Sequence, residues 1–454
     1  MRLFSLALLM TGLVAAGCGN AASSSGAPVG TSDTSAAPGN AASGNAAPVR
    51  TGAQRWAAED FRRLRHARRG DTTRVGVITN HTARVAPSPA RGADSTAHLI
   101  DVLGRAPGIE VSALFGPEHG LRGTASAGQS VTDGTDEATG APVFSLYGED
   151  RKPTPEQLDD LDALVYDIQD VGARFYTYVT TMGLSMQAAA EAGLPFYVFD
   201  RPDPLGGRYL GGFVLDEAQR SFVGKYPVPA VYGMTPGELA RMIKGEAWLD
   251  GLGDLQLRVA ELGGWERGTT WQDTGLPWTA PSPNIPDPAT AQVYAGAVLF
   301  EATRASEGRG TDAPFKLLGA PWADGQALAD TLSARDLPGV RFEAARFTPT
   351  PREGARDPKH AGQRLWGIRQ VVTNAEAFRP VETGIHVLHA FYRQAEREGV
   401  ENFIDRPGWL ARLAGTERLG RMLGEGARPP AIIEAWRESV QAFRERRQPY
   451  LLYE

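Results

Sequence analysis

Four short apolar runs in the first half of the chain each end in polar side chains. The runs are rich in β-branched and aromatic residues, and segments long enough for helices separate them. Apolar runs that alternate with helix-length segments are typical of parallel strands in an α/β sheet. We therefore expect strands at residues 75–79, 109–115, 163–166 and 196–199. Helices are expected at 94–105, 155–162, 180–193 and 235–248, and an arginine-rich helix at 54–69.

The polar residues that follow these runs are expected to lie close together. In open parallel sheets, ligands bind beyond the carboxyl ends of the strands. Side chains at four such ends would converge on one pocket, which predicts an active site. These side chains are Asn80, His81, Glu118, His119, Asp167, Asp170, Asp200 and Arg201.

The second half of the chain has a different pattern. A strand is expected at 255–260, a loop rich in Trp and Pro at 265–290, and a helix at 289–303. Two strands and a long helix are expected further along, at 339–347, 366–373 and 381–398. The whole pattern predicts a Rossmann-like, mostly parallel α/β domain at 51–245. A smaller mixed α+β domain at 246–454 is expected to complete the cleft.

The first fifty residues have the composition of a sorting signal and a tether. Residues 1–17 combine Arg2, an apolar stretch and small residues directly before Cys18, which is the only cysteine. This pattern is typical of a secretory signal, and small residues before a cysteine resemble a bacterial lipoprotein signal. Residues 18–50 consist almost entirely of small and polar types, which favours a flexible linker. We therefore expect an exported cell-envelope protein held on a membrane by lipid on Cys18, with an ordinary cleaved signal as the alternative.

Composition and missing motifs argue against several functions. The chain has 454 residues, of which 42% are hydrophobic and 22% charged, as expected of a globular protein. Its formal net charge of −6 provides no basic excess for binding nucleic acid. The glycine-rich dinucleotide fingerprint, the phosphate-binding loop and the His-Glu-x-x-His zinc motif do not occur, so no cofactor is expected.

Glu118 is the main candidate for catalysis. It lies in Gly-Pro-Glu-His-Gly at residues 116–120, where the glycines and the proline fix the backbone and direct the side chain. A partly buried glutamate at the carboxyl end of a strand has the properties of a general acid. The structural alternative is that Glu118 caps the following helix or pairs with Arg122.

A second group of candidates follows the third apolar run. Asp167 and Asp170 flank the end of this run, and Arg174 and Tyr176 come shortly afterwards. Two carboxylates, a guanidinium and a phenol suit a carbohydrate with an acidic substituent. The alternative is a structural ion pair that holds the turn.

A glycine-rich loop in the second half supplies further candidates. The segment Ser-Glu-Gly-Arg-Gly-Thr at 306–311 contains Glu307, Arg309 and Thr311. It is either the end of a helix or a functional loop, and two glycines around one arginine favour the second interpretation. The tryptophans of the 265–290 loop either stack on sugar rings or pack in the core; they are Trp265, Trp271 and Trp278.

Several of these motifs together resemble a known family. The segments that carry the resemblance are 114–123, 145–148, 166–178, 199–202, 232–240, 281–284 and 306–315. In this order they resemble the bacterial exo-β-N-acetylmuramidases of glycoside hydrolase family 171. The resemblance implies removal of N-acetylmuramic acid from the non-reducing ends of peptidoglycan fragments. It also implies a Rossmann-like domain facing a smaller domain across the active-site cleft, with Glu118 as the catalytic residue.

Under this hypothesis Glu118 protonates the leaving glycosidic oxygen. The second catalytic group stays open between the 2-acetamido group of the substrate and three carboxylates, Asp167, Asp170 and Glu307. Arg174 and Arg309 are the candidates for binding the lactyl carboxylate of the substrate. The other expected substrate contacts are Asn80, His119, Asp167, Tyr176, Arg201, Asn284 and Thr311.

Two other functions remain open at this point. A non-catalytic envelope lipoprotein could bind muropeptides in the same cleft. A metal-dependent hydrolase could use His81, His119 and Asp167 as ligands, although their spacing matches no known metal site.

Overall fold

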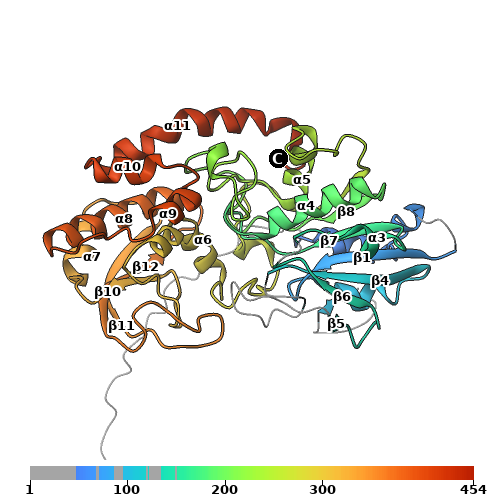
Figure 1. The fold of residues 1–454 in the computed structure, drawn as a ribbon, viewed down its shortest axis with the longest axis horizontal. Helices are drawn as coiled ribbons and strands as arrows, with labels where there is room; N and C mark the ends of the chain where they lie inside the picture. Colours follow the sequence, from blue (N-terminus) through green and yellow to red (C-terminus); the bar gives the residue numbers. More distant parts are fainter. Residues whose placement is uncertain (1–47, 68–70, 86–95, 119–120, 122–133, 149–150) are drawn as a thin grey trace, which may run out of the picture. The chain divides into compact units, whose positions relative to one another are not determined.

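A seven-stranded sheet forms the framework of the first half of the chain (Figure 1). Its strands are β1 Thr73–Thr79, β4 Ile109–Gly116, β5 Gly134–Thr135, β6 Pro142–Ser145, β7 Ala163–Asp167, β8 Phe196–Phe199 and β9 Leu257–Ala260. They lie in the order β5-β6-β4-β1-β7-β8-β9, and all neighbours are parallel except β5 and β6. The four predicted strands and their parallel arrangement are therefore confirmed.

This is a computed structural model of the protein. It describes residues 48–67, 71–85, 96–118, 121, 134–148 and 151–454. The signal expected at 1–17, Cys18 and nearly all of the linker expected at 18–50 lie outside these residues, as does His119. Within the described part, no helix is long and apolar enough to cross a membrane.

Both faces of the central strands of the parallel sheet are buried. Successive residues of a strand point to opposite faces, so Phe196 and Val198 of β8 pack into one hydrophobic cluster, and Tyr197 and Phe199 into another. Because neither face of β7 and β8 meets solvent, their sequences are almost continuously apolar rather than alternating. This explains why the first half of the chain reads so clearly as strands.

Helices cover the two faces of this sheet. The cluster that contains Phe196 also contains the buried side chains of α4 and α5, and the cluster that contains Tyr197 contains those of α1 and α2. The helices of this half are α1 Gly52–Ala57, α2 Leu99–Leu103, α3 Pro155–Leu158, α4 Tyr178–Glu191 and α5 Pro236–Gly245. A small antiparallel pair and three 3₁₀ turns accompany them: β2 Arg84–Val85, β3 Ala97–His98, η1 Leu64–Ala67, η3 Glu217–Gln219 and η4 Gln272–Thr274.

The second half builds a smaller, antiparallel sheet with helices, as expected. Its strands β10 Leu317–Ala320, β12 Leu365–Val372 and β11 Val340–Phe347 lie in that order. The helices are α6 Pro288–Ala297, α7 Gly325–Ser333, α8 Pro380–Arg397, α9 Pro407–Ala414, α10 Arg418–Gly424 and α11 Pro429–Arg446, with 3₁₀ turns η5 Val298–Ala302 and η6 Gln448–Tyr450. One hydrophobic cluster continues from the parallel sheet into this half, through residues such as Phe300, Phe315 and Phe391.

Some elements differ from the sequence-based expectation. The helix expected at 94–105 is shorter, because His98 caps α2 by accepting a hydrogen bond from the Ile100 amide at 3.2 Å. Only Gly52–Ala57 of the segment around 54–69 is α-helical. Strand β9 pairs with β8, so the parallel sheet extends beyond the boundary expected at residue 245. Strand β10 and helix α7 were not expected from the hydrophobic pattern.

The last residues of the chain return to the parallel sheet. The Tyr453 hydroxyl donates to Asp200 at 2.6 Å, directly after β8, and the Leu452 amide donates to Glu238 of α5 at 2.8 Å. The Arg267 amide donates to the backbone carbonyl of Glu454 at 2.7 Å. The C-terminal segment is therefore part of the first half's structure.

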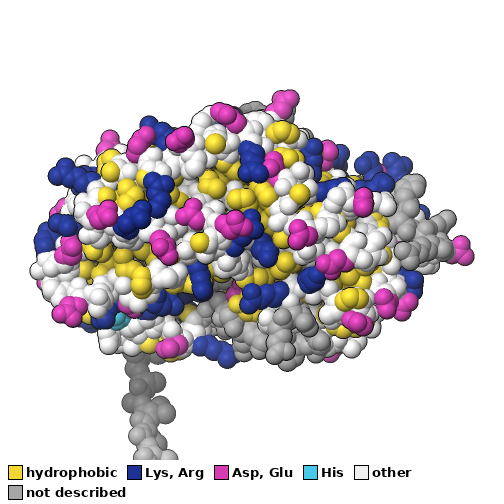
Figure 2. Space-filling view, turned by 45° about the horizontal axis from the view of Figure 1, so that its top comes forward, with side chains coloured by type: hydrophobic (Ala, Val, Ile, Leu, Met, Phe, Trp, Pro, Cys, Tyr) yellow, Lys and Arg dark blue, Asp and Glu magenta, His cyan; other side chains and the backbone are white. Residues whose placement is uncertain are grey.

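The surface carries no large area of one charge in the view of Figure 2. Basic, acidic and apolar side chains are interspersed over this face. This distribution agrees with the modest net charge of −6.

Candidate active site

A cavity of about 820 Å³ is lined by residues from both halves of the chain. This volume lies within the range of small-molecule sites, about 300–1,000 Å³. The first half contributes Glu118, Tyr147, Phe175, Tyr176, Thr177, Phe222 and Val223. The polar lining from the second half comprises Ser282, Asn284, Tyr294, Glu301, Glu307, Arg309, Arg356, Asp357, Lys359, Arg406 and Trp409.

Glu118 reaches this cavity because it follows β4 directly. Its Oε2 accepts a hydrogen bond from the Thr177 hydroxyl at 2.8 Å. The Tyr147 hydroxyl also donates to Glu118; burial raises the pKa of Tyr147 to about 12, and the charge and hydrogen bond of Glu118 add to this effect. Two hydroxyls thus orient a partly exposed carboxylate, as a group that exchanges a proton with a ligand requires.

The 306–311 loop approaches the cavity through two glycines in the left-handed region. Gly308 has φ 76° and Gly310 has φ 80°. A Cβ on Gly308 would lie 2.5 Å from the Leu317 carbonyl oxygen, and one on Gly310 would lie 2.7 Å from Pro358. Only glycine tolerates both the positive φ and the lack of space for a Cβ. The loop therefore holds Glu307 and Arg309 in one defined position.

Arg309 lies between two carboxylates on the cavity wall. Its Nη2 is 2.6 Å from Glu301 Oε1 and its Nε is 3.7 Å from Glu307 Oε1. Burial lowers the pKa of Arg309, but the charges of Glu301 and Glu307 outweigh burial and hold it above its ordinary value. The Trp409 indole donates to Glu301 as well, at 3.3 Å. These contacts fix the positions of both carboxylates on the cavity wall.

Lys359 fixes the base of this wall. Its ammonium donates to the carbonyls of Phe300 at 2.7 Å and Thr303 at 2.8 Å, and more weakly to those of Glu301 and Ala305 at 3.2 Å. It also lies 3.1 Å from Glu307 Oε2. These carbonyls lie at the C-terminal end of η5 and just after it, where the partial negative charge of the carbonyl oxygens favours a cation. Lys359 is therefore committed to the backbone and to Glu307.

Arg356 is the most available cation of the cavity. It is exposed and makes no hydrogen bond or ion pair with another described residue. Arg406, in contrast, donates to the Glu301 carbonyl and lies over the Trp409 ring. The cavity thus combines a carboxylate held by hydroxyls with a guanidinium that is able to meet a second anion.

Five of the residues expected from sequence line this cavity: Glu118, Tyr176, Asn284, Glu307 and Arg309. Tyr176 is held by edge-to-face contacts with Tyr178 and Tyr294, with centroids 4.9 and 5.9 Å apart. The Asn284 amide donates to the Gly354 carbonyl at 2.8 Å, which ties the 281–286 loop to the segment that carries Arg356.

Other expected residues do not line the cavity but form a buried cluster at the carboxyl edge of the sheet. We call this set the edge cluster: Asn80, Asp167, Asp170, Asp200 and Arg201, all at most 5% exposed. Asp167 and Arg201 form a two-pronged ion pair, in which Arg201 Nη2 lies 3.1 Å from Asp167 Oδ2. Asn80 accepts from the amide and hydroxyl of Thr82. These contacts lie inside the protein.

Asp170 is also internal. It accepts hydrogen bonds from the Gly172 amide at 2.9 Å and the Tyr232 hydroxyl at 3.0 Å. Burial raises the pKa of Asp170 to about 6, and these hydrogen bonds offset only part of the effect. Its position gives it no contact with the cavity that Glu118 lines.

Arg174 occupies a place that differs from the expected one. Its guanidinium donates to the carbonyls of Phe213 at 2.7 Å, Val228 at 2.8 Å and Leu413 at 2.9 Å. Burial lowers the pKa of Arg174 to about 9. Because the side chain is 1% exposed and both of its Nη atoms donate to backbone oxygens, it joins α9 to the first half and does not reach a ligand in the cavity.

The remaining candidates have local roles. The Thr311 hydroxyl donates to the Gly308 carbonyl at 2.6 Å and shapes the loop. The ring of His81 contacts the Ala280 carbonyl at 2.7 Å, and Asp167 is engaged by Arg201, so neither is arranged with the other as a metal ligand. Among the described residues, no group of three His, Cys, Asp or Glu side chains is placed to hold a metal. None of the three tryptophans of the 265–290 loop lines the cavity; they are Trp265, Trp271 and Trp278.

Several cavity residues were missed by sequence reasoning. Tyr147 and Thr177 lie in segments that carried the family resemblance, so their neighbourhood was a usable signal. Glu301, Arg356 and Trp409 lie in segments without a motif, where nothing in the local pattern distinguishes them from surface residues.

The chain is similar to known proteins over most of its length. Residues 75–289 match the family described as "Exo-beta-N-acetylmuramidase NamZ, N-terminal", and residues 292–453 match its C-terminal counterpart. The peptidoglycan beta-N-acetylmuramidase NamZ of Bacillus subtilis (strain 168) is 42% identical over 380 residues, which cover 84% of this chain and 87% of that protein. Two crystal structures of DUF1343 family proteins from Bacteroides fragilis NCTC 9343 are 34% and 30% identical, with TM-scores of 0.78 and 0.69. Each covers 90% of this chain and 99% of its own.

Proposed function

The chain belongs to the exo-beta-N-acetylmuramidase NamZ family of glycoside hydrolases, and from this premise we propose how its cavity acts. The protein is an exo-acting glycoside hydrolase that releases N-acetylmuramic acid from the non-reducing ends of peptidoglycan fragments. The observation that carries the proposal is the position of Glu118, which two hydroxyls orient in a cavity that also holds charged groups of the second half.

Glu118 is the general acid of this proposal. Its carboxyl group donates a proton to the glycosidic oxygen as the bond to the anomeric carbon breaks. Thr177 and Tyr147 keep the carboxyl oriented toward the cavity. Proton donation by a positioned side chain contributes about 10²–10⁴-fold to the rate of such a step.

A positive charge develops on the sugar ring during the reaction. As the leaving group departs, the ring becomes oxocarbenium-like, and its positive charge is stabilised by a nearby carboxylate or by the 2-acetamido oxygen. Glu307 and Glu301 line the same cavity, and both form ion pairs with Arg309. Asp167 and Asp170 do not line it, so Glu307 is the carboxylate that we favour for this role.

The lactyl carboxylate of the substrate needs a cation when it leaves water. Arg356 supplies one, because no described carboxylate engages its guanidinium. Arg309 faces the cavity as well, but Glu301 and Glu307 already share its charge. The aromatic rings of Tyr176 and Tyr294 provide flat surface beside these groups. This pairing would favour muramic acid over N-acetylglucosamine, which lacks the lactyl group.

We also propose that the chain acts at the cell envelope while anchored through Cys18. The support is the sequence of residues 1–17 and the small and polar composition of residues 18–50. Labelling with radioactive palmitate in a bacterial host, compared with Cys18→Ser, tests the anchor. A variant that labels as strongly as the wild type would contradict it.

Two disaccharides test the proposed activity. The wild-type protein is expected to release free sugar from N-acetylmuramyl-β-1,4-N-acetylglucosamine and to leave the reverse disaccharide, with N-acetylglucosamine at the non-reducing end, intact. The products are identified by mass spectrometry. Equal cleavage of both disaccharides, or release of larger fragments from the interior of a longer chain, would refute the proposed specificity.

A further inference from the structure

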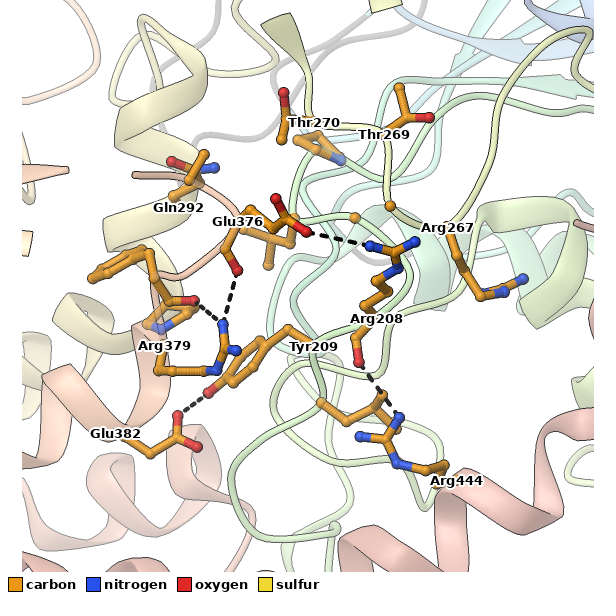
Figure 3. A pocket seen from close by; sticks show the side chains of 18 residues that line it. Arg208, Tyr209, Arg267, Thr269, Thr270, Gln292, Glu376, Arg379, Glu382 and Arg444 are labelled. Atoms are coloured by element: carbon orange, nitrogen blue, oxygen red, sulfur yellow. Dashed lines mark hydrogen bonds and ion pairs between the residues drawn. The ribbon is translucent and has the colours of Figure 1, made fainter. Parts of the chain in front are cut away.

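A second cavity lies apart from the one that contains Glu118. It has a volume of about 300 Å³, and none of its lining residues lines the larger cavity. Figure 3 shows it enclosed by the loop around Arg208, the loop at Thr269 and Thr270, Gln292 of α6, the segment before α8, and Arg444 of α11. Both halves of the chain therefore contribute to it, as is common for ligand sites.

The wall of this cavity has more positive than negative charge available. Arg379 donates to the carbonyls of Glu376 at 2.9 Å and Ala377 at 2.8 Å, and Arg444 to that of Arg208 at 3.4 Å. Neither Arg379 nor Arg444 pairs with a carboxylate of the described residues. The other two arginines of the wall do so: Arg208 through an exposed contact with Glu376 at 3.3 Å, and Arg267 through a buried ion pair with Glu238.

Gln292 is a polar group without a partner in this wall. Its side chain belongs to a residue that is 5% exposed, it lines the cavity, and it makes no hydrogen bond with a described residue. A fully buried amide normally finds hydrogen-bond partners. The side-chain oxygen and nitrogen of Gln292 are not among the fully buried polar atoms, so they open onto the cavity. Tyr294, two residues along α6, lines the larger cavity instead. The Gln292 side chain is therefore directed into the smaller cavity, where a ligand or solvent must supply its hydrogen-bond partners.

Apart from Thr269, Thr270, Arg267 and Glu382, most of the remaining lining is apolar. Leu205, Leu210, Phe378 and Pro380 contribute to the wall, and the Arg379 guanidinium lies over the Tyr209 ring at 5.8 Å. A bare inorganic anion would leave this surface uncovered. An organic acid with a small apolar part would use both the guanidinium groups and the apolar wall.

We propose that this cavity binds a small organic carboxylate of amino-acid or dipeptide size. Arg444 and Arg379 receive its carboxylate, Gln292 hydrogen-bonds its amide, and the apolar wall covers its side chain. The site is separate from the glycosidic reaction and does not depend on Glu118.

Calorimetric titration of the whole protein with D-alanyl-D-alanine tests this proposal. We expect saturable binding that weakens by at least about tenfold in Arg444→Gln and in Gln292→Leu, because each loses a hydrogen bond to the ligand. Arg437→Gln is the matched control: Arg437 is also an exposed arginine of α11, it pairs with Glu434, and it does not line the cavity. This control is expected to bind like the wild type.

Three results would overturn the proposal. The first is unchanged binding in Arg444→Gln when its thermal unfolding matches that of the wild type. The second is binding of inorganic phosphate as tight as that of the dipeptide, which would indicate a general anion site. The third is displacement of the dipeptide by free N-acetylmuramic acid, which would place it in the larger cavity. If the glycosidase assignment failed, the expected dipeptide titration would be unaffected.

Discussion

The edge cluster and the larger cavity lie at the same end of the parallel sheet but use their polar residues differently. In the edge cluster, Asp167 and Arg201 satisfy each other, and Asp170 bonds Gly172 and Tyr232. In the cavity, the Thr177 and Tyr147 hydroxyls donate to Glu118, and Arg356 makes no hydrogen bond or ion pair with a described residue. A position after a strand therefore indicates where a polar side chain lies, whereas its exposure to the cavity decides whether it can meet a ligand.

The largest expected effect is the loss of activity in Glu118→Gln. Glutamine keeps the shape and the hydrogen bond from Thr177 but has no proton to give, so turnover of a chromogenic N-acetylmuramide should fall about 10²–10⁴-fold. Urea unfolding should stay close to wild type. Glu110→Gln, an exposed change on β4, is the control and should remain active. Full activity in Glu118→Gln would assign the acid to another residue and remove the contrast between the two regions.

Asp167→Ala tests the opposite side of the comparison. It leaves the Arg201 guanidinium buried without its partner, which costs about 3–5 kcal/mol of unfolding free energy. Urea denaturation measures this loss. The double variant Asp167→Ala with Arg201→Met should recover part of it, because no unpaired charge remains. An Asp167→Ala protein that is as stable as wild type but inactive would place Asp167 in the reaction after all.

Asp170→Asn tests the edge cluster through pH. Burial raises the pKa of Asp170 from 3.8 to about 6, so the folded protein keeps a proton that the unfolded chain loses between these values. The free energy of unfolding should therefore fall as pH rises from about 4 to about 6 and level off above it, by about 3 kcal/mol for this group. Denaturation at several pH values should show a shallower fall in Asp170→Asn.

The fall in the free energy of unfolding with rising pH should not vanish in Asp170→Asn. Burial also raises the pKa of Asp200, to about 7, and that of Asp203, and both groups remain. Asp254→Asn, at an exposed site, is the control and should keep the wild-type slope. An Asp170→Asn protein with the full wild-type slope would show that Asp170 is not the group that titrates.

Arg356→Gln should have the smallest of these effects. Loss of one charge-assisted contact, worth about 1.5–3 kcal/mol, should raise KM for the N-acetylmuramide by about tenfold or more with little change in kcat. The preference over the N-acetylglucosaminide should fall by the same factor. Arg364→Gln, on the exposed start of the β12 region and outside the cavity, is the control. An unchanged preference would mean that another cation meets the lactyl group.

The fold was more predictable than the site because its signals are local. Residues 163–166 and 196–199 are apolar on both faces, and this pattern follows directly from burial between two layers of helices. The helix expected at 94–105 was too long because the hydrophobic pattern does not reveal the cap at His98.

The site required information that the local sequence does not contain. The sequence around Arg174 is the same whether this side chain meets a ligand or three backbone carbonyls. Only the path of distant segments such as α9 decides between these two roles. Arg356 lies in an irregular stretch whose importance comes from where the 281–286 loop holds it. By contrast, Glu118 and Arg309 were found because each lies between two glycines in a short motif of the sequence.

The contacts of Tyr453 and Leu452 have a consequence for the order in which the chain matures. A ribosome delivers these two residues long after their partners Asp200 and Glu238, which belong to the first half. The contacts can therefore form only once residues 452 and 453 have been synthesised. A premature stop before Leu452 would remove partners from a region more than two hundred residues earlier in the chain.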